Sequence, residues 1–163
     1  MNSKAQIQSK FWGLELSKTY PSLRYAGNII ANRCESLEVH DGLNQIIAEQ
    51  GVFGGNEWDY AGFYFFESSV GQTLYMVSFF NKYKTILPAK RTFDLLAEAL
   101  TDKYGTPIIK EDETVLLNLW GKKSEDACCL LKANQEGNLI IISLDYINQS
   151  VLQESIQQNR NEL

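Results

Sequence analysis

A short pattern occurs twice in this chain, and the repetition constrains the fold more than any single motif. Each copy has an aromatic residue before a glycine, then an aspartate near an alanine, an apolar run, another glycine and a serine-containing strand. The first copy runs from Phe53 to Phe79, and the second, about 66 residues later, runs from Trp120 to Leu144. Such repetition predicts two copies of one structural unit, and it carries no chemistry of its own.

Length and composition indicate one globular domain. The chain has 163 residues, of which 44% are hydrophobic and 21% charged. A chain of this size can bury a single substantial core, and the composition is not that of a disordered protein. We therefore expect one domain over residues 1–163, with internal repeats over about 17–83 and 88–146.

The order of expected elements is the same in both halves. Pro21 opens a helix, with Ser17 or Thr19 as its cap and an apolar stripe from Leu23 to Cys34, and strands follow at residues 45–53, 58–66 and 73–80. A second helix follows Pro88 and ends at Gly105, and strands follow at residues 114–120, 126–133 and 138–146. Residues 148–163 form a polar tail with the pattern of a short helix.

These elements predict an α+β fold. Short turns between strands favour antiparallel pairing. Two α-β-β-β repeats should form one antiparallel sheet of about six strands, with the helices on one face and a short C-terminal helix. We expect Phe63, Phe79, Leu100 and Ile142 in the core, and we place Tyr75 on the same covered face.

The other face of the sheet differs between the copies. In the first copy it carries six large side chains, Trp58, Tyr60, Tyr64, Phe66, Met76 and Phe80. At the equivalent positions of Tyr60, Phe66 and Phe80, the second copy has Asp126, Lys132 and Asp145, as a solvated face would. Large aromatic side chains gathered on an open face are typical of a binding surface. Three occupants fit these six residues: the chain's own termini, a second copy in a homo-oligomer, or a separate partner.

Charge excludes one class of partner. The net charge is −5, and acidic residues outnumber basic ones in both halves, so no basic stripe indicates nucleic-acid binding. No apolar run reaches the ~20 residues of a membrane span. The residues as given hold no signal peptide, although a chain trimmed of one would look the same, so the compartment stays open.

Residues for catalysis or metal binding are sparse. The single histidine, His40, precedes Asp41 and Gly42 in a turn pattern, and no nucleophile motif accompanies it. The cysteines, Cys34, Cys128 and Cys129, form no disulfide framework and no metal-ligand spacing. The sequence therefore predicts a protein that is not an enzyme, with no metal site and no cofactor.

Several segments resemble a group of uncharacterised secreted or lipid-anchored proteins of gut Bacteroidetes. They are residues 11–16, the Gly54-Gly55 pair, residues 100–107 and residues 142–146. Those proteins are similar to the tandem-repeat fold of the beta-lactamase inhibitor protein and of small outer-membrane assembly lipoproteins. The resemblance covers about residues 11–146. It implies protein binding or envelope maintenance, a periplasmic or cell-envelope location, and no catalytic residues.

The leading functional hypothesis is a non-enzymatic module whose open sheet face binds a protein or peptide. One alternative is a homodimer like the secretion chaperones, which also combine helices with antiparallel strands. A small hydrolase is the alternative from a different class, and it would need His40 to meet a carboxylate and a nucleophile in one pocket.

Overall fold

A computed structural model describes residues 4–121 and 126–161. The first half contains β1 (Lys10–Phe11), β2 (Leu14–Glu15), β3 (Thr19–Tyr20), α1 (Leu23–Ile30), β4 (Cys34–His40), β5 (Gln45–Phe53), β6 (Asn56–Ser68) and β7 (Gly71–Tyr83). The second half contains α2 (Ile86–Tyr104), β8 (Ile108–Glu111), β9 (Val115–Trp120), β10 (Ala127–Glu136), β11 (Leu139–Asn148) and α3 (Gln149–Asn161).

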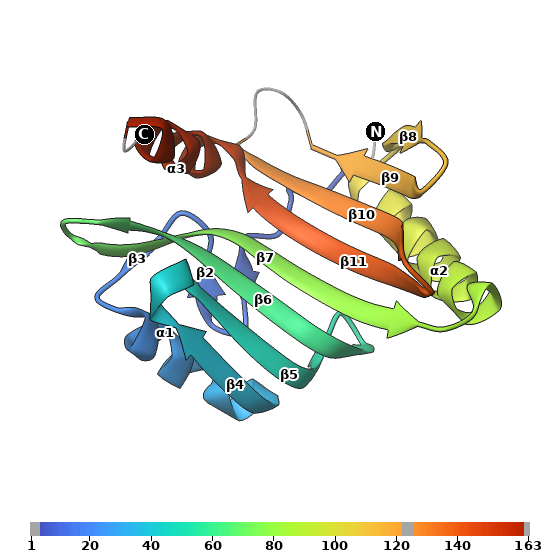
Figure 1. Ribbon diagram of the computed structural model, residues 1–163. Coiled ribbons are helices and arrows are strands. Elements are labelled where there is room, and N and C mark those ends of the chain that lie inside the picture. The colour runs from blue at the N-terminus through green and yellow to red at the C-terminus, as the bar shows by residue number, and fades with distance from the viewer. Residues whose placement is uncertain (1–3, 122–125, 162–163) are drawn as a thin grey trace.

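One antiparallel sheet of nine strands dominates the structure. Its order is β4-β5-β6-β7-β11-β10-β9-β8, and β3 pairs with one end of β7 (Figure 1). The last long strand of each half, β7 or β11, lies at the centre, and these two pair from Tyr83↔Ile140 to Met76↔Ile147. The α+β fold, the antiparallel sheet and the short C-terminal helix are thereby confirmed.

One face of the sheet, which we call the covered face, packs against α1, α2 and the β1–β2 hairpin (Figure 1). The side chains between these layers form the core. Phe63 and Phe79 are fully buried there, Ile142 is 1% exposed and Leu100 is 7% exposed, so the predicted core positions are confirmed. Phe11 and Trp12 extend from the hairpin beneath the sheet, and both rings contact Phe79.

The sheet has nine strands and not the expected six, because β3, β4 and β8 join it as well. Residues near Cys34 were predicted to continue the first helix, but α1 ends at Ile30 and Cys34 begins β4. The α1 cap is Ser22, which accepts a hydrogen bond from the Tyr25 N–H. Gly27 of this helix faces the strand, and an added Cβ there would lie 3.5 Å from Val39 Cγ2, which is an ordinary van der Waals distance. In the second half, the additional strand is β8.

The C-terminal helix packs differently from α1 and α2. It contacts β6, β7 and β11. Ser155 and Gln158 of α3 line a pocket together with Phe66 and Tyr75. The opposite face of the sheet, which we call the open face, is therefore bordered by α3 at one end.

Candidate functional site

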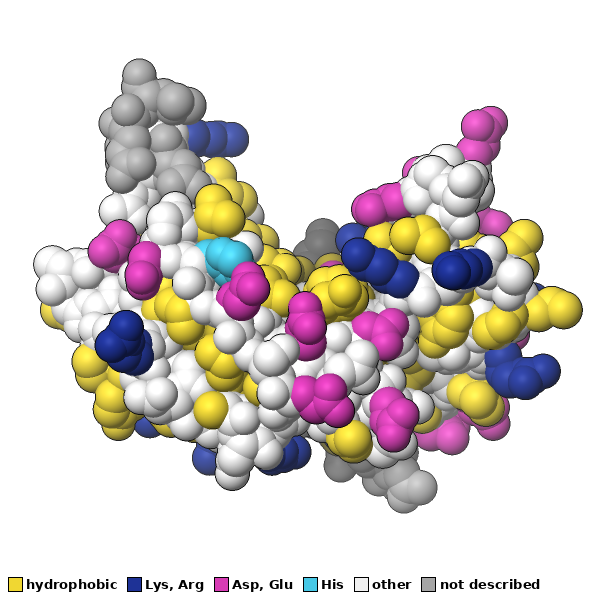
Figure 2. All heavy atoms as spheres, turned by 60° about the horizontal axis from the view of Figure 1, so that its bottom comes forward, with side chains coloured by type: hydrophobic (Ala, Val, Ile, Leu, Met, Phe, Trp, Pro, Cys, Tyr) yellow, Lys and Arg dark blue, Asp and Glu magenta, His cyan; other side chains and the backbone are white. Residues whose placement is uncertain are grey.

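Five of the six predicted binding residues lie on the open face. Tyr60, Tyr64 and Phe66 come from β6, and Met76 and Phe80 come from β7. Each is half-buried, so none is sealed inside the molecule. Figure 2 shows the molecule with its β4 edge forward, and its surface is hollowed between two raised sides with hydrophobic side chains along the hollow. We call these five residues the aromatic face.

Two aromatic rings stack at the centre of this face. Tyr60 and Phe80 are register partners on β6 and β7, and their ring centroids lie 5.0 Å apart with an interplanar angle of 16°. The Lys82 ammonium lies 5.1 Å from the centroid of the Tyr60 ring. Stacked rings with one face toward solvent offer a partner a rigid apolar area that loses little entropy on binding.

A glycine determines how the neighbouring tyrosine lies. An added Cβ at Gly62 would lie 2.6 Å from the Tyr64 hydroxyl oxygen and 2.7 Å from Cε2 of its ring. The Tyr64 ring therefore rests on the backbone of Gly62, where any larger residue would displace it. Burial raises the pKa of the Tyr64 phenol, and the charge of Asp145 adds to this effect.

The register between β6 and β7 shifts at one point. The pairing passes from Tyr64↔Met76 to Phe65↔Leu74, so Tyr75 is left without a register partner. Leu74 is fully buried in its place, whereas Tyr75 is half-buried. The prediction that Tyr75 shares the covered face was wrong, because alternation along a strand fails at a β-bulge.

Trp58 does not belong to the aromatic face. It is 1% exposed, its indole N–H donates to the Phe53 carbonyl at 3.0 Å, and its ring lies 6.0 Å from that of Phe79 in the core. The cause is an interruption at Gln50, whose φ is 57°. On the far side of Gln50, the side chain of Trp58 points to the covered face, whereas that of Tyr60 points to the open face. The placement of Trp58 on the open face was therefore wrong.

A buried carboxyl group lies beside the aromatic face. Asp145 of β11 is 7% exposed, and its Oδ1 accepts a hydrogen bond of 2.5 Å from the hydroxyl of Ser78 on β7. Ser143, also on β11, is 6% exposed, and its Oγ has no hydrogen-bond partner among the described residues. Asp145 was predicted to lie on a solvated surface. The structure instead buries it between rows of larger side chains.

Burial raises the pKa of the Asp145 carboxyl. The hydrogen bond from Ser78 and the positive charge of Lys132 oppose this effect but are smaller. The phenol of Tyr64 and the thiols of Cys128 and Cys129 are the other titratable groups that sense its charge. The protein therefore holds a carboxyl group where ionisation is costly, and such groups gather at functional sites.

Replacing Asp145 with asparagine should change how stability depends on pH. Because the pKa of Asp145 is higher in the folded than in the unfolded chain, the folded state keeps its proton as pH rises past about 4. The free energy of unfolding of the wild type then falls until pH exceeds the folded pKa. The melting temperature of Asp145→Asn should therefore gain on that of the wild type as pH rises above about 4 toward the raised pKa of the folded state. A difference between the two proteins that stays constant over this range would contradict the assignment.

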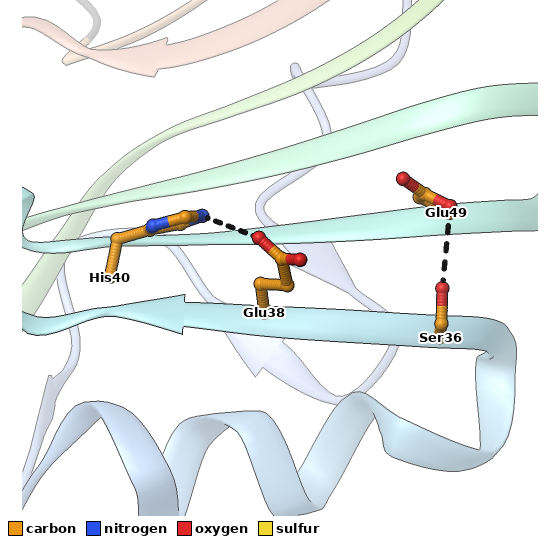
Figure 3. A network of polar contacts seen from close by, with 4 residues as sticks. All are labelled: Ser36, Glu38, His40 and Glu49. Atoms are coloured by element: carbon orange, nitrogen blue, oxygen red, sulfur yellow. Dashed lines mark hydrogen bonds and ion pairs between the residues drawn. The ribbon is translucent and has the colours of Figure 1, made fainter.

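The β4–β5 side of the open face is acidic. Figure 3 shows Ser36, Glu38 and His40 on β4 with Glu49 on β5. His40 Nε2 lies 3.3 Å from Glu38 Oε2, and the Ser36 hydroxyl donates to Glu49 Oε2 at 3.5 Å. The sequence places His40 beside Asp41, but the carboxylate that His40 contacts is that of Glu38. Glu38 and Glu49 form an acidic rim beside the aromatic face.

In the part of the chain that the structure describes, no three His, Cys, Asp or Glu side chains gather as a metal site would require. No described helix is both long and apolar enough to cross a bilayer. Comparison with protein-family models, with curated proteins and with solved structures gives no match.

Proposed function

We propose that this protein is a non-enzymatic binding module of the cell envelope and that its aromatic face receives a protein or peptide. The observation that carries the proposal is the stacked, half-buried pair Tyr60 and Phe80 on the open face. The acidic rim and the Asp145 carboxyl add polar groups around an apolar centre, which is the usual anatomy of a protein interface. The envelope location comes from the resemblance described above.

The difference between the two halves supports this reading. We take the halves as copies of one unit, since each contains a helix followed by four strands. A duplicated unit that served stability alone would gain nothing from large aromatic side chains on the open face of only one copy. Burial of such side chains contributes roughly 25 cal/mol per Å², although area alone does not set affinity.

The double variant Tyr60→Ser with Phe80→Ser tests the proposal. Both side chains are half-buried on the sheet surface, so their loss should lower the free energy of unfolding by only about 1 kcal/mol. Capture of envelope proteins on the immobilised wild type, identified by mass spectrometry, should yield at least one protein that the double variant fails to retain.

A matched control is Leu95→Ser on α2. Leu95 is 63% exposed and lies outside the aromatic face, so this variant should capture the same protein as the wild type. If the double variant captures it equally well, the aromatic face is not the binding surface. Light scattering separates the homodimer alternative, because a wild-type dimer that becomes a monomer in the double variant would show that a second copy occupies the face.

A further inference from the structure

A groove lies on the covered side of the sheet where α2 begins, and we call it the α2 groove. One wall is the first half of α2, which starts beside the β10–β11 turn (Figure 1). The floor is a row across three strands, because Leu116 pairs with Ala133 and Ala133 pairs with Ile142. Six apolar residues line the inner part of the groove: Ala89, Phe93, Leu116, Ala133, Ile140 and Ile142. This part has a volume of about 270 Å³, close to the size of small-molecule sites in proteins.

The lining of the α2 groove changes from apolar to polar along its length. Ile86 and Ile140 line both the inner part and a wider mouth at the start of α2, so the two parts are continuous. The mouth has four polar residues in its lining: Lys84, Thr85, Gln135 and Asn138. An apolar interior that ends in a polar mouth fits a ligand with a hydrocarbon tail and one polar end.

The inner part of the groove favours a hydrocarbon over a peptide backbone. The six inner side chains carry no polar atom, and β10 in the floor is paired on both sides, with β9 and β11. A peptide backbone would bring N–H and C=O groups that find no partner there, which is costly. A hydrocarbon tail brings no such groups.

The charges around the groove determine the sign of the polar end. Lys84 is the only charged residue in the described lining of the mouth, and it forms no ion pair with another described residue. Lys90 lies along the wall, but its Nζ is 2.6 Å from Asp94 Oδ2, so these two charges offset each other. At the opposite end, next to Leu116, the acidic residues 111–113 line the surface. An anionic group is therefore attracted to the mouth and repelled from the far end.

We propose that the α2 groove binds a free fatty acid, independently of the aromatic face. The carboxylate lies at the mouth near the Lys84 ammonium, and the tail extends along α2 over Ile140 and Ala133. The small volume of the inner part selects a single unbranched chain.

Amide chemical shifts in NMR, recorded on the full chain at neutral pH, test this inference. Decanoate, added below the concentration at which it forms micelles, should shift the amides of Ala89, Ala133 and Ile140 saturably. From hexanoate to octanoate to decanoate, each added pair of methylenes should tighten binding by up to about tenfold, because each buries more apolar surface. The wild type should also bind decanoate more tightly than decyltrimethylammonium, which has the same tail and the opposite charge.

Two variants locate the polar end and the tail. Lys84→Glu should weaken decanoate binding at least about threefold and reverse the preference between the two probes. Arg24→Glu, the same change of charge at an exposed position on α1, should leave decanoate binding unchanged. Ala133→Phe places a ring in the inner part and should abolish binding in a protein that circular dichroism shows to be folded. The chain-length series on the wild type decides the matter even if this variant does not fold.

No saturable shift of these amides, or an affinity that does not depend on tail length, would overturn the inference. So would a wild type that prefers decyltrimethylammonium, or an equal loss of decanoate binding in Lys84→Glu and Arg24→Glu. Sedimentation with phosphatidylglycerol vesicles separates a membrane surface from a fatty-acid site: a protein that binds the vesicles but not decanoate has no such site. The Tyr60→Ser, Phe80→Ser double variant should bind decanoate as the wild type does, so failure of the proposed function and failure of this inference are distinguishable.

Discussion

Truncating Phe63 to alanine should lower the free energy of unfolding by about 3–5 kcal/mol. Phe63 is fully buried on the covered face, and its ring centroid lies 5.8 Å from that of Trp12 in the β1–β2 region. Removing the ring deletes apolar contacts and leaves a cavity, because the surrounding strands are fixed by their pairing on both sides. Urea unfolding followed by circular dichroism measures the change, with the slope of the transition unchanged.

Phe66→Ala is the matched control on the same strand. Phe66 is half-buried on the open face, so its truncation should cost clearly less than that of Phe63. If Phe63→Ala melted like the wild type, or if Phe66→Ala were the more destabilising change, the assignment of the two faces would be inverted.

The α+β class and the long strands follow from the periodicity of the apolar residues. The order of helix and strands in each half was predicted, because apolar residues recur with a period of two in the strands and near 3.6 in the helices. The predicted strand at residues 45–53 coincides with β5, Gln45–Phe53. The helix stop was also predictable, since Gly105 ends α2 with a φ of 99° and its N–H donates to the Thr101 carbonyl.

The missed strands have a physical explanation. Cys34 follows Ile30 at helical spacing, so the apolar stripe alone favoured one longer helix. The short β8, Ile108–Glu111, is exposed along its whole length and carries no inward alternation that a pattern could detect. β4 and β8 join the sheet by pairing with β5 and β9. The apolar pattern of a helix gives no sign of such pairing.

The site could be predicted only in part. Alternation placed Tyr60, Tyr64, Phe66, Met76 and Phe80 on the open face, and the structure places them there. Asp145 was interpreted as evidence of a wet surface, because polar residues on one side of a strand usually face water. Its burial depends on larger side chains of β6 and β7, and β7 becomes the neighbour of β11 only through the pairing of the two halves.

Trp58→Ala should also lower the free energy of unfolding by about 3–5 kcal/mol. Had Trp58 belonged to the open face, its loss would impair partner capture and leave stability nearly intact. Its burial against Phe79 and its hydrogen bond to the Phe53 carbonyl predict the reverse. Urea unfolding and envelope-protein capture, measured on the same purified variant, distinguish the two outcomes.

Two comparisons make the Trp58 result specific. Trp58→Phe keeps most of the ring volume but removes the donor to the Phe53 carbonyl, so it should cost about 1–3 kcal/mol, less than the alanine variant. Tyr60→Ala removes a half-buried ring two residues away on the same strand and should cost about 1 kcal/mol or less. The pairing of β5 with β6 is interrupted at Gln50, between the pairs Glu49↔Tyr60 and Gly51↔Trp58. Trp58 therefore stabilises the fold, while Tyr60 remains available to a partner. If the Trp58→Ala variant were as stable as the wild type but failed to capture the envelope protein, Trp58 would belong to the binding surface.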